Sequence, residues 1–221
     1  MKSYADLRAI AVTRKGEAEL EALLPDAPPV PLVRQSDDRI LAAFSKGVFQ
    51  AGFNWAVIEN KWPGFEAAFH GFDIARNAMM SDEDLDAHLQ NTAIVRNGRK
   101  IISVRDNAVF LSDLAREHGS AAACLGNWPL EDTTGLFDLL KTRGNRLGGM
   151  TGQYALRTLG FGNFILSKSV VSALNMAGVI DGGANSKAAR RAVQAAFNEW
   201  ANESGESHAH ISRVLAFSVP D

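Results

Sequence analysis

Hydrophobic positions along most of this chain recur every three or four residues, which is the spacing of one face of an α-helix. The pattern is clearest in residues 40–51, 101–111 and 189–200. No segment shows the alternation of β-branched and polar residues that would predict a half-buried strand. The sequence therefore predicts an all-α protein of about ten short helices.

Helix starts are marked by residues that cap the first turn. The segment SDED at 81–84 has the pattern of a capping box, in which a serine and an acidic residue three positions later satisfy free N–H groups. Asp37 precedes the first long periodic segment, and Asn185 and Ser186 precede the last long one. We therefore expect helices to begin close to these positions.

One stretch interrupts the helical pattern near the N-terminus. The segment PDAPPVP at 25–31 contains four prolines, which exclude a helix and favour an extended strap. We therefore divide the chain into an N-terminal helical arm with its proline-rich strap, residues 1–33, and a main domain, residues 34–221.

Composition and charge narrow the class of protein. The chain has 221 residues, of which 46% are hydrophobic and 22% charged, and its formal net charge is −2. This is typical of a soluble globular domain, and any nucleic-acid contact must be local. No apolar run is long enough for a membrane span, and the start MKSYADLRAI lacks the apolar core of a secretory signal, so we expect a cytoplasmic protein with no membrane partner. Cys124 is the single cysteine, which excludes an internal disulfide and a multi-thiolate metal site.

A glycine-rich turn runs into an apolar helix in the segment LGGMTGQYALRTLG, residues 147–160. Gly148, Gly149 and Gly152 allow a tight turn, and the following helix, which we expect to begin near Met150, directs free N–H groups and its positive dipole end at this point. Such a place suits an anion such as phosphate. The helix expected before the turn, at 136–146, adds the basic residues Lys141, Arg143 and Arg146. The alternative is that the glycines only end one helix and start the next.

The cluster RNGRK at 96–100 is a second candidate phosphate contact, or a solvated turn.

Three blocks of sequence resemble one known family, the bacterial DNA-3-methyladenine glycosylase I family, which carries a helix-hairpin-helix. The blocks are VFQAGFNWAVIENKWPGFEAAFHGFD at 48–73, AIVRNGRKI at 93–101, and LKTRG with Tyr154 at 140–154. The similarity extends from about residue 36 to about residue 162, and the order and spacing of the blocks agree. The resemblance implies a two-lobed helical fold, double-stranded DNA with a damaged base as partner, and base-excision repair by hydrolysis of a glycosidic bond after base flipping.

The resemblance also assigns roles to individual residues. It gives the DNA grip to Gly148, Gly149 and Gly152, and base stacking to Trp55, with Gln50 and Asn54 as polar partners for the base edge. An indole suits 3-methyladenine because that base is cationic in DNA and a cation is attracted to an aromatic face. We interpret the other aromatic residues of this block, Phe49, Phe53 and Trp62, as core packing.

One departure from the family concerns a carboxylate. The family has a glutamate three residues before the glutamine of the QAG block, and Gly47 stands there in this chain. Glu59, one turn after Trp55, is a weak candidate for a replacement, and the alternative is a solvated glutamate beside Lys61. Asp37 and Asp38 are further candidates that serve equally well as helix caps. The catalytic residue therefore stays unassigned, with Glu59 as a weak candidate.

Other departures concern metal and the type of chemistry. The zinc site that the family uses to join its termini needs cysteines that this chain lacks, and His208 and His210 cannot complete it, so we expect no metal and no cofactor. Gln153 stands where strand-cleaving relatives have a nucleophilic lysine, and Asn163 lies in the region of their activating aspartate. A glutamine cannot form a Schiff base. The resemblance therefore implies a monofunctional glycosylase for labile, cationic alkylated bases.

Two alternatives stay open at this point. The chain could be a catalytically attenuated DNA-binding relative, because the glutamate is missing. It could also be a helical interaction module whose hairpin only joins two lobes. For any of the three we expect a monomer.

Overall fold

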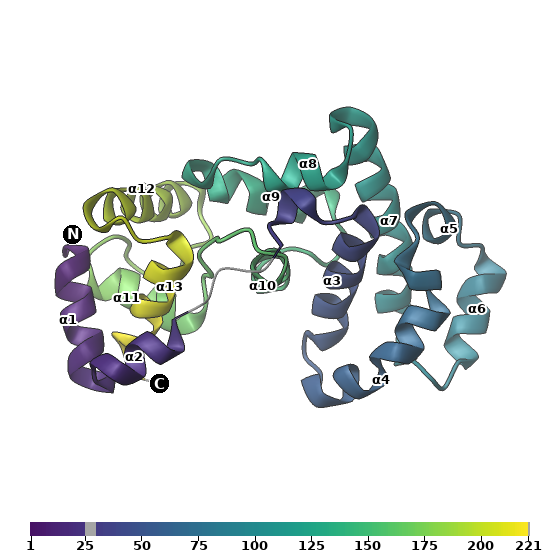
Figure 1. Ribbon diagram of the computed structural model, residues 1–221, viewed down its shortest axis with the longest axis horizontal. Helices are drawn as coiled ribbons and strands as arrows, with labels where there is room; N and C mark the ends of the chain where they lie inside the picture. Colours follow the sequence, from purple (N-terminus) through teal and green to yellow (C-terminus); the bar gives the residue numbers. More distant parts are fainter. Residues whose placement is uncertain (25–29, 221) are drawn as a thin grey trace. The chain divides into compact units, whose positions relative to one another are not determined.

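The structure is a computed structural model that describes residues 1–24 and 30–220. Within these residues there are thirteen α-helices and three short 3-10 helices and no strand, which confirms the all-α prediction (Figure 1). In chain order they are α1 (Tyr4–Lys15), α2 (Glu17–Leu23), η1 (Leu32–Arg34), α3 (Asp37–Gln50), α4 (Trp55–Ala68), η2 (His70–Phe72), α5 (Ile74–Ala78), α6 (Asp82–Gln90), α7 (Gly98–His118), α8 (Ala121–Gly126), η3 (Leu130–Asp132), α9 (Thr133–Arg143), α10 (Met150–Thr158), α11 (Lys168–Met176), α12 (Lys187–Ser204) and α13 (His208–Phe217).

The capping residues act as the sequence predicts in two places. Ser81 caps α6 in a full capping box with Asp84, and the Ser186 side chain accepts a hydrogen bond from the Ala189 N–H at the start of α12. Asp37 differs, because it is the first residue of α3 and its two carboxylate oxygens accept the N–H groups of Ala121 and Ala122 at the start of α8. Asp37 therefore caps α8 through a tertiary contact, which links α8 to α3.

The helices form two compact units. We call residues 30–128 and 137–161 the central unit, and residues 1–24, 129–136 and 162–220 the terminal unit. The terminal unit thus groups α1 and α2 with α11, α12 and α13, whereas the sequence-based division at residue 34 follows chain order. Most of the proline strap, residues 25–29, lies outside the described residues.

The central unit is organised around α3. This helix contacts α4, α7, α8 and α10, and its buried side chains Ile40, Leu41, Phe44, Val48 and Phe49 follow the predicted apolar stripe. An aromatic cluster extends this core toward α4 and η2. Its members, Phe49, Trp62, Phe65, Phe69 and Phe72, have neighbouring ring centroids 4.5 to 6.3 Å apart. The cluster packs α4 against α3 and η2.

The terminal unit joins the two ends of the chain. Trp200, fully buried in α12, donates its indole N–H to the Lys2 carbonyl at 3.0 Å, and the Lys2 N–H donates to the Ala177 carbonyl at 2.9 Å. Arg14 in α1 donates to the Phe217 carbonyl at the end of α13. The ends of the described chain are therefore held by packing and hydrogen bonds.

Candidate functional site

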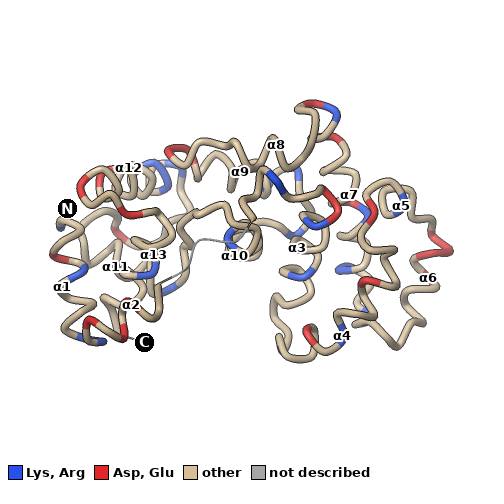
Figure 2. Tube along the Cα trace, viewed as in Figure 1, with Lys and Arg blue, Asp and Glu red and all other residues tan. Residues whose placement is uncertain are grey.

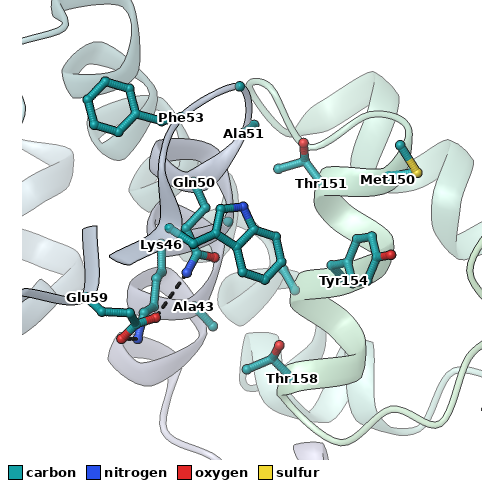
Figure 3. A pocket seen from close by; sticks show the side chains of 14 residues that line it. Ala43, Lys46, Gln50, Ala51, Phe53, Glu59, Met150, Thr151, Tyr154 and Thr158 are labelled. Carbon is teal, nitrogen blue, oxygen red and sulfur yellow. Dashed lines mark hydrogen bonds and ion pairs between the residues drawn. The ribbon is translucent and has the colours of Figure 1, made fainter. Parts of the chain in front are cut away.

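A pocket of about 560 Å³ lies in the central unit between the end of α3, the start of α4 and one side of α10. This volume is within the range of small-molecule sites. Figure 3 shows side chains of α3 and α4 facing those of α10 across it. The residues that line it are Ala43, Lys46, Gly47, Gln50, Ala51, Gly52, Phe53, Trp55, Glu59, Met150, Thr151, Tyr154, Ala155 and Thr158.

Trp55 supplies the largest aromatic surface of the pocket. It is the first residue of α4, and 56% of it is exposed. Its ring meets Tyr154 of α10 edge to face, with the centroids 6.4 Å apart and the planes at 84°. Because both side chains are partly exposed and their planes are nearly perpendicular, Tyr154 does not stack on the indole, and a planar ring that enters the pocket can do so. The geometry therefore fits the stacking role expected of Trp55.

A charged network lies along one wall. The Glu59 carboxylate receives the Lys46 ammonium at 2.7 Å on one oxygen and the Gln50 side-chain N–H at 3.0 Å on the other (Figure 3). The Lys46 ammonium also lies 5.0 Å from the centre of the Trp62 ring. Glu59 is thus neither an isolated surface residue nor a partner of Lys61, which instead donates to the Thr92 carbonyl. The sequence signal for this network is the spacing of Lys46 and Gln50, which are one helical turn apart on α3.

Gly47 lies on the pocket wall where α3 meets α10. A Cβ atom placed on it would lie 3.5 Å from the Thr151 carbonyl oxygen and 3.7 Å from the Ala155 Cβ, which are ordinary van der Waals distances. The backbone therefore has room for a Cβ atom at this position, and the glycine leaves the pocket without the carboxylate that the resemblance places there.

Two residues near Trp55 occupy places that the sequence did not predict. The Asn54 side chain caps α4, accepting the Ala56 N–H at 2.9 Å, and it is not among the residues that line the pocket. Phe53 was expected in the core, which is wrong, because 43% of it is exposed and it lines the pocket. Residues 51–56 are all exposed, so the α3–α4 turn offers Phe53 no core to pack into. Phe49 is fully buried, as expected, and Trp62 is partly buried between Phe65 and Phe72.

The glycine hairpin forms where the sequence predicts it, between α9 and α10. Gly149 has φ +62° and ψ −145°, a conformation that only glycine adopts readily, and no side chain caps the N-terminus of α10 there. Gly152 is buried, and a Cβ on it would lie 2.2 Å from the Leu147 carbonyl oxygen and 2.9 Å from the Leu140 side chain. Gly149 therefore shapes the turn, and Gly152 allows the two helices to approach closely.

The basic residues beside the hairpin have different surroundings. Arg143 makes a bidentate ion pair with Glu117, with N–O distances of 2.8 and 2.7 Å, and this pairing raises the pKa of Arg143 and lowers that of Glu117. Lys141 and Arg146 are exposed. Lys and Arg also occur on α3 and beside α10, the two helices that face the pocket (Figure 2). The guanidinium of Arg143 is thus already paired with a carboxylate.

A second cavity of about 400 Å³ lies beside the turn, lined by Val48, Ala51, Lys100, Arg146, Gly148 and Thr151. Lys100 donates to the carbonyls of Phe49 and Ala51 at 3.0 and 2.8 Å, and so closes the C-terminal end of α3. Burial, and then the charge of Arg146, lower the pKa of Lys100. The RNGRK cluster therefore contributes a lysine that supports the pocket turn.

Other candidates lie away from the pocket. Gln153 is buried in α10, and Asn163 is buried in the terminal unit, where its side chain donates to the Phe164 carbonyl. His208 is buried beside Phe164 and Phe197. In the described part of the chain, no group of three or more His, Cys, Asp and Glu side chains is arranged to hold a metal ion.

This chain is an all-helical protein of the helix-hairpin-helix class, because a glycine hairpin joins α9 to α10. An aromatic pocket is built against the second of these helices. Comparison with known proteins narrows this class. The model of the methyladenine glycosylase family matches residues 31–157, which is more than half of the chain. This chain therefore belongs to the methyladenine glycosylase family.

Individual relatives agree with this assignment. The DNA-3-methyladenine glycosylase of Haemophilus influenzae and the DNA-3-methyladenine glycosylase 1 of Escherichia coli are each 36% identical to this chain over 59 residues, which is 27% of this chain and 32% of the relative. The matched segment thus spans about a third of these curated relatives. A crystal structure of 3-methyladenine DNA glycosylase I is 26% identical, with a TM-score of 0.51 over 62% of this chain and 84% of that one. The Staphylococcus aureus enzyme, at 19% identity and a TM-score of 0.54 over 68% of this chain and 92% of that one, shows the same fold.

No helix within the described residues is both long enough and apolar enough to cross a membrane.

Proposed function

We propose that this protein is a monofunctional DNA glycosylase that hydrolyses the N-glycosidic bond of 3-methyladenine, or of a related cationic alkylated base, after flipping the nucleotide out of duplex DNA. The observation that carries the proposal is the exposed indole of Trp55, which meets Tyr154 in a pocket of about 560 Å³, large enough to admit a base, in a chain of the methyladenine glycosylase family. A base that leaves the stack loses its neighbours, and an aromatic wall replaces them.

The hairpin supports a grip on the DNA backbone. The turn at Gly149 exposes the uncapped N-terminus of α10, and such a terminus attracts a phosphate. We assign DNA binding to Gly148 and Gly149 in the turn and to the basic residues beside it, Lys141, Arg143 and Arg146. Gly152, the sixth residue of this assignment to the hairpin, is buried in α10 and supports the grip by letting α10 approach Leu147. Arg143 must give up its ion pair with Glu117 to bind a phosphate. We expect this exchange only if the free energy gained from the phosphate contact exceeds the free energy lost with the ion pair.

The chemistry that fits this chain is hydrolysis of an activated bond. A cationic base is a good leaving group, so its removal needs positioning and charge stabilisation more than a strong base. Gln153 cannot form the covalent intermediate that strand cleavage requires. Glu59 is the carboxylate of the pocket, although Lys46 balances its charge.

A base-release assay tests the proposal. The protein is incubated with methylated duplex DNA, and the bases that appear in solution are separated by chromatography. We expect 3-methyladenine to be released and the strands to stay uncut. Unmethylated duplex is the control, and intact binding without release of any alkylated base would contradict the proposal.

Gly47 favours a second candidate function, a DNA-binding relative with weakened catalysis. The pocket lacks the family's carboxylate at this position, and the distances around Gly47 allow one to be restored. If catalysis is attenuated, Gly47→Glu should raise the rate of 3-methyladenine release by about tenfold or more, because a carboxylate attracts the cationic base into the pocket and stabilises the positive charge that passes to the sugar as the bond breaks. Gly47→Gln is the matched control, since it adds the same bulk without the charge. An equal rate in the three proteins would exclude this candidate.

A further inference from the structure

The Lys46–Glu59–Gln50 network has a consequence for base selection, which rests on the proposed function. We infer that Glu59 is a positioning residue: it fixes the orientation of the Gln50 side-chain amide, so that the pocket selects purines with an amino group at position 6 over purines with an oxygen there.

The orientation of the amide follows from the chemistry of its partner. A carboxylate can only accept hydrogen bonds, so the side of the Gln50 amide that faces Glu59 must be its nitrogen. The two atoms are 3.0 Å apart. The amide is planar, and its oxygen therefore lies on the opposite side. Figure 3 shows the oxygen of Gln50 directed away from Glu59.

Glu59 is itself held in place. Its other carboxylate oxygen receives the Lys46 ammonium at 2.7 Å, and the same ammonium lies over the Trp62 ring at 5.0 Å. Each oxygen of Glu59 therefore has a separate partner. Rotation of the carboxylate away from Gln50 would break the ion pair as well as the hydrogen bond, so the orientation of Gln50 is set by the whole network.

The free oxygen of Gln50 discriminates between bases because it can only accept a hydrogen bond. Among the residues that line the pocket, the hydroxyl groups of Thr151, Tyr154 and Thr158 can either donate or accept, so they adapt to any base. The Gln50 oxygen cannot adapt. It can bond the N6 amino group of an adenine, whereas the O6 atom of a 6-oxopurine would meet it acceptor to acceptor.

Because Gly47 has no side chain, recognition of the base on this wall of the pocket depends more on Gln50. Gly47 lies one turn before Gln50 on the same helix and lines the same pocket, but it contributes no polar atom beyond its backbone. On this wall the acceptor that reads the base is therefore the Gln50 amide, and its orientation decides which base edge is accepted.

Binding of free bases to the full-length protein tests the inference without relying on catalysis. The probes are 3-methyladenine and 3-methylhypoxanthine, which differ at position 6 by an amino group and an oxygen, and the measurement is the dissociation constant by calorimetry. We expect the wild type to bind 3-methyladenine at least about tenfold more tightly, since a site with an oriented hydrogen-bond acceptor discriminates against a ligand that presents a second acceptor to it.

Glu59→Gln is the decisive variant. Its amide is the same size but can present either a donor or an acceptor, so Gln50 is free to turn over and present its nitrogen to the 6-oxopurine. We expect the preference to fall to about twofold or less. Glu83→Gln, an exposed change of the same type on α6 of the same unit, should leave the preference unchanged. Gln50→Met, which removes the amide, should abolish the preference.

The outcomes are distinguishable. A wild-type preference that survives Glu59→Gln in a protein with an unchanged melting temperature would overturn the inference while leaving the glycosylase proposal intact. A wild type that binds neither base would overturn the proposed function, and this inference with it.

Discussion

At the scale of single residues, the most informative side chain is Trp55. A large aromatic residue that is 56% exposed forgoes the stabilisation of burial, which is about 25 cal/mol for each Å² of apolar surface. Its position at the first turn of α4 explains this exposure, because no earlier turn of the helix covers it. The Asn54 cap and the buried aromatic cluster hold this first turn in place, so the indole is presented by a rigid support.

Replacement of Trp55 tests the proposed stacking directly. We expect Trp55→Ala to lower the rate of 3-methyladenine release by about 10- to 100-fold, because stacking of a base on an aromatic ring contributes about 1–3 kcal/mol. The free energy of unfolding should change by less than about 0.5 kcal/mol, since the side chain is exposed. Trp55→Phe is the control, and it should retain part of the activity. Base release and chemical denaturation measure the two effects, and equal loss in both variants would argue against stacking.

A further residue-scale prediction concerns the basic side chains of the hairpin. Arg146 is exposed, whereas Arg143 is paired with Glu117 and lies 5.6 Å from the Phe110 ring. In a titration of duplex DNA at several salt concentrations, we expect Arg146→Ala to reduce the slope of log K against log salt by about one. Arg143→Ala should reduce it by less, because loss of Arg143 also releases Glu117. A larger effect of Arg143→Ala would show that its pair opens on DNA.

At the scale of elements, the hairpin depends on two glycines for different reasons. Gly149 adopts a backbone conformation that disfavours other residues, and Gly152 lets α10 approach the carbonyl of Leu147. The same hairpin places Thr151, Tyr154 and Ala155 on the pocket side of α10. The element that we assign to DNA binding is thus also one wall of the pocket, so a change in its packing should affect both.

Gly152→Ala tests this coupling. The added Cβ would lie 2.2 Å from a carbonyl oxygen, so the backbone must shift, and we expect a loss of about 1–3 kcal/mol in the free energy of unfolding. Affinity for duplex DNA should fall as well. Gly98→Ala is the matched control in the same unit, because its Cβ would meet only a leucine methyl group at 3.6 Å. Urea denaturation and DNA titration of both variants make the comparison, and unchanged DNA affinity in Gly152→Ala would separate hairpin packing from binding.

At the scale of the whole molecule, the chain forms two units by contacts that cross large distances in sequence. The terminal unit packs α1 against α13 and α12 and closes with hydrogen bonds from Trp200 and Arg14 to the opposite end of the chain. Its core contains His208, which lies 5.9 Å from the Phe164 ring and 5.7 Å from the Phe197 ring. The Nδ1 atom of His208 is buried and makes no hydrogen bond to any part of the chain that the structure describes.

The buried histidine predicts how stability depends on pH. Burial lowers the pKa of His208 below its ordinary value of 6.5, against a smaller opposing effect of Glu131, so the unfolded chain takes up this proton before the folded chain does. The contribution to stability is therefore complete above about pH 6.5 and is lost as the pH falls below it, by at most about 1.4 kcal/mol per pH unit. We expect His208→Gln to weaken the pH dependence of the free energy of unfolding between pH 7 and 5. Urea denaturation across this range checks it, and parallel curves for the two proteins would contradict it.

The sequence by itself determined the helical class, the starts of α6 and α12, the hairpin and the family. These depend on interactions within a few residues, such as the capping box at Ser81, and on local blocks of side chains. The tertiary structure alone decided that Phe53 is exposed and that Asp37 caps α8. It also decided that Glu59 joins Lys46 and Gln50, and that the first two helices pack with the last three. The physical reason is that burial and hydrogen-bond partners depend on which distant segments meet, and no local pattern records that.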